Sequence, residues 1–323
     1  MGKTKKVLIF SDFGVDDIIA LIYAYYSSEI EIVGIVADYG NIPKEDALRN
    51  IEFLNEVTGV RLPTFGGDYT SLTGIEPAYF AEIHGPAGMG FIVPPDNGVA
   101  EEAIENFYEV IPLIEKYKGE LIILSVGRLT SLATIMVLAP NAIKDVKEFY
   151  IMGGAFLPPG NITAVAEANF YGDPYAANLV LKKSPKKLRI LPLDVTKYAL
   201  FSPGTINSLH QQFEQAGDRP GTLIKPMFDY YYSFYRRTYP NLSGAPIHDL
   251  LAMWAISDQA KIQYKDVPVT IGVNLGNTFG QSIGDFREGK EKEKWPVHQI
   301  AAAFHYPSFF NHILETFKPR ERY

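Results

Sequence analysis

The sequence contains no cysteine. This absence excludes disulfide bonds, thiolate zinc sites and a cysteine nucleophile. Long apolar runs are also missing, since none reaches the roughly 18 residues that a membrane-spanning helix needs. The apolar segment after the N-terminal lysines ends at Ser11-Asp12, too early for the core of a signal peptide with its cleavage site. These absences predict a cytoplasmic protein without a membrane partner.

The sequence also lacks an excess of positive charge. Its 323 residues include 30 lysines and arginines against 37 acids, which gives a formal net charge of -7. Phosphates repel an acidic protein, so the charge argues against nucleic acid as a partner. No linker, internal repeat or shift in composition divides the chain. The sequence therefore predicts one domain over residues 1–323.

Short β-branched runs alternate with longer helical patterns. The runs predict strands buried on both faces, and the segments between them predict helices. This alternation indicates an α/β fold with a mainly parallel central sheet and helices on both faces, followed by a helical C-terminal part. The predicted strands are 6–10, 30–37, 121–126, 148–152, 188–193, 269–273 and 297–302. The predicted helices are 16–28, 44–60, 129–138, 174–183, 205–215, 223–239, 247–259 and a last one from residue 308.

Ligands bind beyond the carboxyl ends of the strands in such sheets. This rule places four segments on one rim: 11–17, 38–41 and the two that begin at Gly127 and Gly153. We therefore expect the functional residues in these segments.

The first of these segments places three carboxylates, Asp12, Asp16 and Asp17, within six residues. A helix cap or first-turn acid accounts for one of them, but not for three. The tripeptide Asp-Phe-Gly also binds magnesium in protein kinases, but there a glycine-rich loop and a catalytic loop precede it. Only eleven residues precede Asp12 here, so we reject this interpretation. A hard-cation site accounts for the charge best. Asp12 and Asp17 can converge on one ion, whereas Asp16 is rotated about 100° around the helix and should face away.

The stretch Phe-Ser-Asp-Phe-Gly-Val-Asp-Asp resembles the N-terminal signature of the inosine-uridine preferring nucleoside hydrolases, Asp-x-Asp-Pro-Gly-x-Asp-Asp. Further motifs follow in the order of that family from residue 6 to about residue 260, which is most of the chain. They are Gly40-Asn41, His84-Gly85, Gly88, the segments 126–131 and 152–155, Gly160-Asn161, the segment 167–169 with Asp173-Pro174, and the segments 193–196 and 246–249.

The resemblance implies calcium-dependent hydrolysis of the N-glycosidic bond of ribonucleosides to ribose and free nucleobase. Asp12 would act as general base on a metal-bound water, and His248 would assist the leaving base. The family's calcium ligands correspond to Asp12, Asp17, Asp249 and the backbone oxygen of Val126, all of them hard donors. Its ribose-binding positions correspond to Asp16, Asn41, Asn161, Glu167 and Asn169. The family also implies a homodimer or homotetramer.

Several alternatives stay open. Phe10 and Phe13 replace the first aspartate and the proline of the signature, and Arg128 replaces a proline after Gly127. Phe10 and Arg128 motivate a rival hypothesis, a non-catalytic protein that binds nucleoside or ribose on the same fold. A magnesium phosphohydrolase with the same acids is a third hypothesis, although the negative site would repel a phosphoryl group. His84 could close over the sugar or only order its loop, and the aromatic run 228–235 could stack a base or belong to the core.

Overall fold

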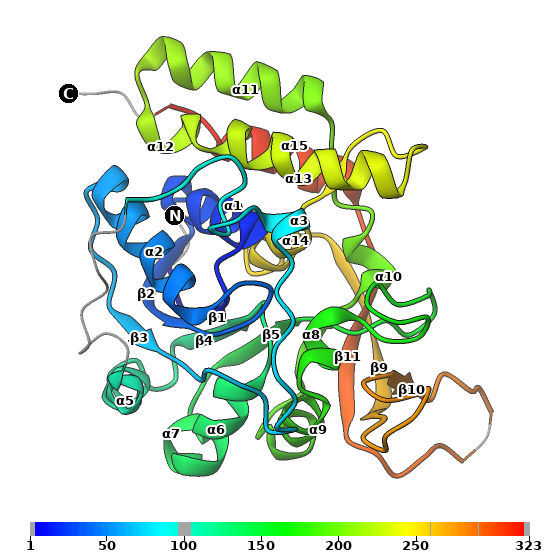
Figure 1. Ribbon diagram of the computed structural model, residues 1–323. Helices are drawn as coiled ribbons and strands as arrows, with labels where there is room; N and C mark the ends of the chain where they lie inside the picture. Colours follow the sequence, from blue (N-terminus) through cyan, green and yellow to red (C-terminus); the bar gives the residue numbers. More distant parts are fainter. Residues whose placement is uncertain (1–3, 96–104, 259, 290, 320–323) are drawn as a thin grey trace.

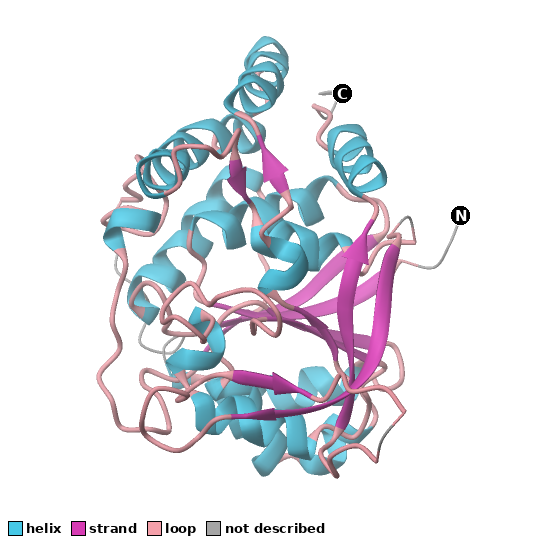
Figure 2. Cartoon of the chain, turned by 90° about the vertical axis from the view of Figure 1, so that its right-hand side faces the viewer, coloured by secondary structure: helices cyan, strands magenta, loops and turns pink. Residues whose placement is uncertain are grey.

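The computed structural model describes residues 4–95, 105–258, 260–289 and 291–319. Its centre is a nine-stranded sheet with the order β10-β9-β11-β6-β5-β4-β1-β2-β3 (Figures 1 and 2). Every neighbouring pair of strands from β11 to β3 is parallel. At the other edge, β9 pairs antiparallel with β11, and β10 pairs antiparallel with β9. The sheet strands are β1 (Lys5–Ser11), β2 (Ile30–Ala37), β3 (Thr64–Gly66), β4 (Leu121–Ser125), β5 (Glu148–Met152), β6 (Arg189–Leu191), β9 (Ile262–Ile271), β10 (Ser282–Gly284) and β11 (Val297–Phe304). A separate pair consists of β7 (Leu200–Phe201) and β8 (Ala245–Pro246).

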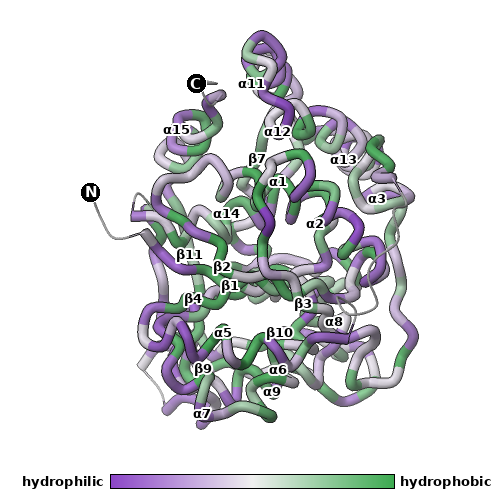
Figure 3. The backbone as a smooth tube through the Cα atoms, turned by 90° about the vertical axis from the view of Figure 1, so that its left-hand side faces the viewer, coloured by the Kyte–Doolittle hydropathy of each residue, from purple (hydrophilic) through white to green (hydrophobic). Residues whose placement is uncertain are grey.

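Helices cover both faces of the sheet (Figure 3). One face carries α5 (Val110–Lys116), α6 (Thr130–Leu138), α7 (Pro140–Lys144) and α9 (Pro174–Lys183). The other carries α1 (Val15–Tyr26), α2 (Lys44–Thr58) and α14 (His248–Trp254), with α11 (Pro203–Ala216), α12 (Arg219–Thr222), α13 (Ile224–Thr238) and α15 (Tyr306–Thr316) beyond them. The short helices are α3 (Ala81–His84), η1 (Phe107–Glu109), α8 (Ala168–Gly172) and α10 (Leu193–Thr196). This arrangement confirms the predicted α/β fold with a mainly parallel sheet. No helix in the described ranges is long and apolar enough to cross a membrane.

Three sequence predictions of element boundaries are wrong. The helix predicted over 247–259 ends at Trp254, because the chain must turn there to reach β9. The strand β9 begins at Ile262 instead of residue 269, since its first half is partly exposed and lacks a continuous apolar pattern. The strand predicted over 188–193 ends at Leu191, and α10 starts two residues later. The short strands β3 and β10 carry too few residues to be recognised from the sequence.

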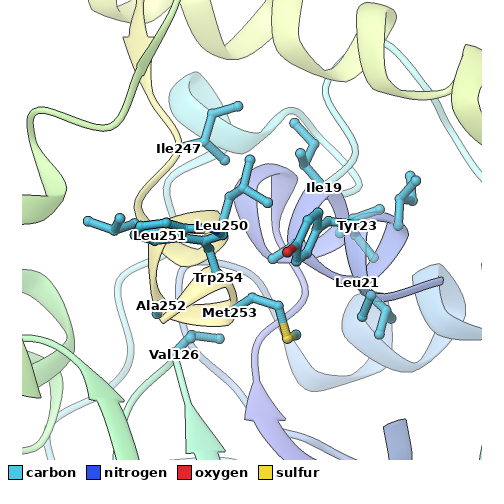
Figure 4. Packing of buried hydrophobic residues seen from close by; sticks show 14 of the residues in the cluster. Ile19, Leu21, Tyr23, Val126, Ile247, Leu250, Leu251, Ala252, Met253 and Trp254 are labelled. Atoms are coloured by element: carbon cyan, nitrogen blue, oxygen red, sulfur yellow. The ribbon is translucent and has the colours of Figure 1, made fainter. Parts of the chain in front are cut away.

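Packing between α1 and α14 joins the two ends of the motif-bearing region. Figure 4 shows Leu250 of α14 facing Ile19 and Tyr23 of α1, with Val126 below Met253. All of these side chains are buried. The apolar contact therefore brings the N-terminal ends of two helices together, and each of those ends carries acidic residues.

Truncation of Leu250 to alanine should weaken this contact. We expect the free energy of unfolding to fall by about 2–5 kcal/mol, because Leu250 is fully buried and its loss leaves a cavity. Leu275→Ala is a matched control at a side chain that is 78% exposed, and it should change stability by less than about 0.5 kcal/mol. Urea denaturation of both variants measures the difference. An equal loss of unfolding free energy in both would show that the α1–α14 contact does not stabilise the fold more than an exposed side chain does.

Candidate active site

The polar residues after β1 and β4 lie side by side at the centre of the sheet. Strand β1 pairs in parallel with β2 on one side and with β4 on the other. The chain runs from β1 toward β2 and later enters β4 on the opposite side, so the direction of strand order reverses here. Ligands bind in the crevice at such a reversal. Asp12 follows β1 and Val126 follows β4, so both lie at this crevice.

A tight turn connects β1 to α1 and orients its acids. Phe13 has a φ of 54°, a left-handed conformation that costs energy for a bulky side chain. The Ser11 hydroxyl accepts the Phe13 N–H at 2.9 Å and donates to the Asp17 carboxylate. Asp17 also accepts the backbone N–H of Gly14 at 3.0 Å. The turn therefore holds Asp17 across the N-terminal end of α1.

The structure brings Asp249 to the same place from the other end of the chain. One carboxylate oxygen each of Asp16, Asp17 and Asp249 lies within 4.8 Å of the others, and all three residues are buried. The sequence analysis placed Asp16 outside the metal site, whereas the structure brings its carboxylate close to those of Asp17 and Asp249. Both residues lie in the first turn of α1, where no preceding turn separates their side chains.

The electrostatics of this cluster favour a cation. Burial raises the pKa of Asp17 and of Asp249 well above its usual range, and the neighbouring carboxylates raise both further. Among the described residues, no lysine or arginine forms an ion pair with any of the three acids. The Nδ1 of His84 lies 3.9 Å from Asp16 Oδ1. Three buried oxygen donors with unmatched negative charge fit a hard divalent cation.

Asp12 belongs to the same cavity but points to the β2 side. Its carboxylate accepts the backbone N–H of Asn41. Gly40 and Gly127 pack against it so closely that a Cβ at either position would contact Asp12 atoms. Burial raises the pKa of Asp12, whereas the hydrogen bond from the Asn41 N–H and the charge of Arg128 lower it. Asp12 is therefore held rigidly beside the acidic cluster.

One cavity is lined by every residue that the sequence predicted for the site. Its lining includes Asp12, Asp16, Asp17, Asn41, Val126, Asn161, Glu167, Asn169, His248 and Asp249. These residues come from segments up to 237 positions apart, namely Asp12 and Asp249. Glu167 accepts the backbone N–H groups of Gly154, Asn169 and Phe170, so its carboxylate is fixed in orientation. The Val126 carbonyl accepts a hydrogen bond from Asn169 Nδ2 at 2.7 Å, and a carbonyl oxygen has a second lone pair that could bind a cation.

Known proteins are similar to this chain in sequence and in fold. The family model of the inosine-uridine preferring nucleoside hydrolases matches residues 7–311. The chain belongs to this family. Membership makes it a nucleoside hydrolase, which is an N-glycosidase.

Individual relatives align with this chain over most of its length. The chain is 29% identical to the inosine-uridine preferring nucleoside hydrolase of Crithidia fasciculata, over 96% of each protein. It is 30% identical to uridine nucleosidase 1 of Arabidopsis thaliana, over 86% of this chain and 82% of that protein. The solved structure of a purine-preferring ribonucleoside hydrolase from Gardnerella vaginalis superposes with a TM-score of 0.85, at 28% identity and over 97% of this chain and 98% of that one.

The cavity of this nucleoside hydrolase is also lined by three residues whose role the sequence left undecided. His84 accepts the Val15 N–H through Nδ1 at 3.1 Å, so its Nε2 carries the proton of the neutral ring. Tyr231 and Tyr235 enter from α13. Their spacing of four residues places both on one helix face, but that spacing equally fits core residues, so the sequence could not separate the two cases.

The tyrosines connect Asp16 to His248 by hydrogen bonds. The Tyr231 hydroxyl lies 3.5 Å from Asp16 Oδ2 and 3.2 Å from the Tyr235 hydroxyl. The Tyr235 hydroxyl lies 3.1 Å from His248 Nε2, and Thr196 Oγ1 lies 2.9 Å from His248 Nδ1. Burial lowers the pKa of His248 and raises that of both tyrosines. Burial therefore favours the uncharged form of His248, Tyr231 and Tyr235.

The three residues that depart from the family signature in this nucleoside hydrolase are all buried. Phe10 is fully buried on the sheet face that carries α6 and α9, away from the acids. Its neighbour across the ladder, Ser125, has a buried hydroxyl without a partner in the described part of the chain. Phe13 is buried on the opposite face. Arg128 is buried beside Tyr39 rather than exposed to solvent.

Proposed function

We propose that this nucleoside hydrolase cleaves the N-glycosidic bond of ribonucleosides to ribose and free nucleobase in a calcium-dependent reaction. The observation that carries the proposal is the convergence of Asp12, the acidic cluster and the amide side chains in one cavity. Carboxylates and amides are the side chains suited to binding the hydroxyl groups of a ribose. The names of relatives that act on uridine, inosine or purine nucleosides support the substrate class.

Asp12, Asp17, Asp249 and the Val126 carbonyl would hold the cation. These donors are all oxygens, as Ca²⁺ requires, and they leave room for water and for sugar hydroxyls. Bound Ca²⁺ would supply Lewis acidity that lowers the pKa of a water molecule. The Asp12 carboxylate is fixed by the Asn41 N–H and accepts the proton of the attacking water.

The cavity's negative charge favours the transition state of glycosidic cleavage. A ribosyl group gains positive charge as the bond to the base breaks. One unit of negative charge at about 5 Å contributes roughly 3 kcal/mol at an effective dielectric near 20, or about two decades of rate. Asp16, which belongs to the acidic cluster, and Glu167 also line the cavity, and their negative charge would act on the sugar as well. The same charge repels a phosphoryl group, which disfavours nucleotide substrates.

His248 and Tyr235 assist the departing base. Both nitrogens of His248 are hydrogen-bonded, one to Tyr235 and one to Thr196. The Tyr235 side chain lines the cavity, so its hydroxyl gives a proton to the base nitrogen while its oxygen takes one from the imidazolium form of His248, which is left as a neutral ring. The bond from the sugar to the base breaks, the base takes the electron pair and the proton, and water completes the ribose.

His248→Ala should therefore slow hydrolysis according to the leaving group. We expect kcat for inosine to fall by about 100-fold, the usual size of a general-acid contribution. Hydrolysis of 4-nitrophenyl riboside should change by less than about threefold, because its leaving group needs no proton. Steady-state rates on both substrates measure the difference. An equal loss on both would show that His248 acts on folding or on the sugar instead.

Incubation with a nucleoside panel tests the proposed function itself. The purified protein with Ca²⁺ should release ribose and base in equal amounts from at least one of inosine, guanosine, adenosine, uridine and cytidine, as measured by chromatography. Tight binding without release would favour the rival, a non-catalytic binding protein. Release of phosphate from nucleotides with Mg²⁺, and no ribose release with Ca²⁺, would favour a phosphohydrolase.

A further inference from the structure

Arg128 is a buried cation without an acidic partner. It directly follows Gly127 at the end of β4 and is only 7% exposed. It forms no ion pair with a carboxylate in the described part of the chain. Its guanidinium stacks on the Tyr39 ring, 4.9 Å from the centroid, and its Nη2 donates to the Ala78 carbonyl at 3.1 Å. A buried charge needs such contacts, so these two groups are its substitute for an acid.

The acceptor, Ala78, lies in an irregular segment that ends at the cavity residue Phe80, and we call this segment, residues 71–80, the strap. The strap is attached to the sheet rim near each of its ends. The Leu72 N–H donates to Asp173 Oδ2 at 2.7 Å, and the Phe80 N–H donates to the Asn41 carbonyl at 2.8 Å. Between these points, within the described residues, only Arg128 bonds the backbone of residues 73–79 to the rest of the protein. The strap therefore depends on Arg128 for its middle attachment.

The strap leads directly into the site. Phe80 lines the cavity, and the Asn41 that holds Phe80 also donates its N–H to Asp12. Apolar side chains of the strap are turned to solvent: Leu72 is 51% and Ile75 is 54% exposed. The strap thus buries little apolar surface of its own, and a single charged hydrogen bond is a large part of its attachment.

The protein has room for Arg128 because of Gly172. A Cβ at position 172 would overlap the Nε and Cδ of Arg128. The side chain thus runs between the Tyr39 ring and the backbone at the end of α8. Tyr39 is fixed in turn, since its hydroxyl lies 2.8 Å from Thr130 Oγ1. This fixed position aims the guanidinium at the strap.

We propose that Arg128 is a positioning residue that fixes the strap and thereby holds Phe80 and Asn41 against the bound nucleoside. The part of this inference that concerns the nucleoside rests on the proposed function. The part that concerns the strap does not. The alternative role for Arg128 is its positive charge near Asp12, and a lysine retains that charge but loses the planar stack and the directed donor.

Arg128→Met and Arg128→Lys test the proposal, with Arg189→Met as the matched control. Arg189 also stacks on a tyrosine, Tyr150, but it faces another cavity at the opposite ends of the strands. In the nucleoside-free protein, amide hydrogen exchange of residues 71–80 should become about tenfold faster in both Arg128 variants. KM for a hydrolysed nucleoside should rise about tenfold, with kcat within about threefold. Arg189→Met should change neither quantity.

The outcomes distinguish a role of Arg128 in fixing the strap from a role of its charge, and both from a failure of the proposed hydrolysis. Unchanged exchange of residues 71–80 would overturn the proposal. A fall in kcat that lysine restores, with unchanged KM, would also overturn it, in favour of the charge. If Arg128→Met does not fold, Gly172→Ala provides a second test, because it displaces the guanidinium without removing it, and the same rise in exchange is expected. If the wild-type protein hydrolyses no nucleoside, the proposed function fails, while the exchange measurement still decides the role of Arg128.

Discussion

Replacement of Asp12 by asparagine is expected to lower kcat for nucleoside hydrolysis by about 1,000-fold or more. Loss of a general base costs about 100- to 10,000-fold, and loss of one negative charge near the transition state adds to that. Asparagine retains the size of the side chain, and its Oδ1 still accepts the Asn41 N–H. The fold should therefore stay intact. Circular dichroism and steady-state kinetics of the same preparation measure the two effects separately.

The matched control for Asp12→Asn is Asp285→Asn. Asp285 is 5% exposed and pairs with Arg287, outside the cavity. Its replacement should leave kcat unchanged, even if the unfolding midpoint falls. Retention of at least a tenth of the activity in Asp12→Asn would contradict the role of Asp12 as the base.

Replacement of Asp249 by asparagine should raise the Ca²⁺ concentration for half-maximal activity by at least about 100-fold, because a charged ligand becomes a neutral one. Stability should respond in the opposite sense without metal. Burial and neighbouring acids raise the pKa of Asp249, so the ionised carboxylate destabilises the folded state above its ordinary pKa. In excess chelator at pH 7, the variant should therefore melt at the same temperature as the wild type or higher.

Calcium should reverse this order of stability. The wild type gains stability from the bound ion as RT ln(1 + [Ca²⁺]/Kd), whereas the variant gains little at the same concentration. Thermal melts of both proteins in chelator and in Ca²⁺ give all four values. A variant that is less stable than the wild type in chelator, and that needs no more Ca²⁺ for activity, would show that Asp249 is a structural acid.

The positions of the central strands along the chain and the rim of the site followed from the sequence. Strands β1, β2, β4 and β5 are continuous apolar runs, so their positions are visible without coordinates. The carboxyl-end rule then selected the segments that contain Asp12 and Asn41. The resemblance supplied Asp249, which no local pattern connects to the first helix.

Features that depend on packing could not be predicted. The convergence of Asp16 with Asp17 and Asp249 depends on how α14 meets the first turn of α1. The aromatic run on α13 has helical spacing throughout, so only coordinates separate Tyr231 and Tyr235, which line the cavity, from Phe228, which is core. The role of Arg128 could not be predicted either, because its contacts are a backbone carbonyl and an aromatic ring, and neither is marked by an acidic residue in the sequence.

The central claim is that the buried acids of this cavity bind a divalent cation on which nucleoside hydrolysis depends. Ribose release from the best nucleoside of the panel, measured in chelator-treated protein while Ca²⁺ is added back, tests that claim most directly. We predict no release in chelator and recovery of full activity as Ca²⁺ reaches one bound ion per chain. Full ribose release in excess chelator, unchanged on addition of Ca²⁺, would contradict it.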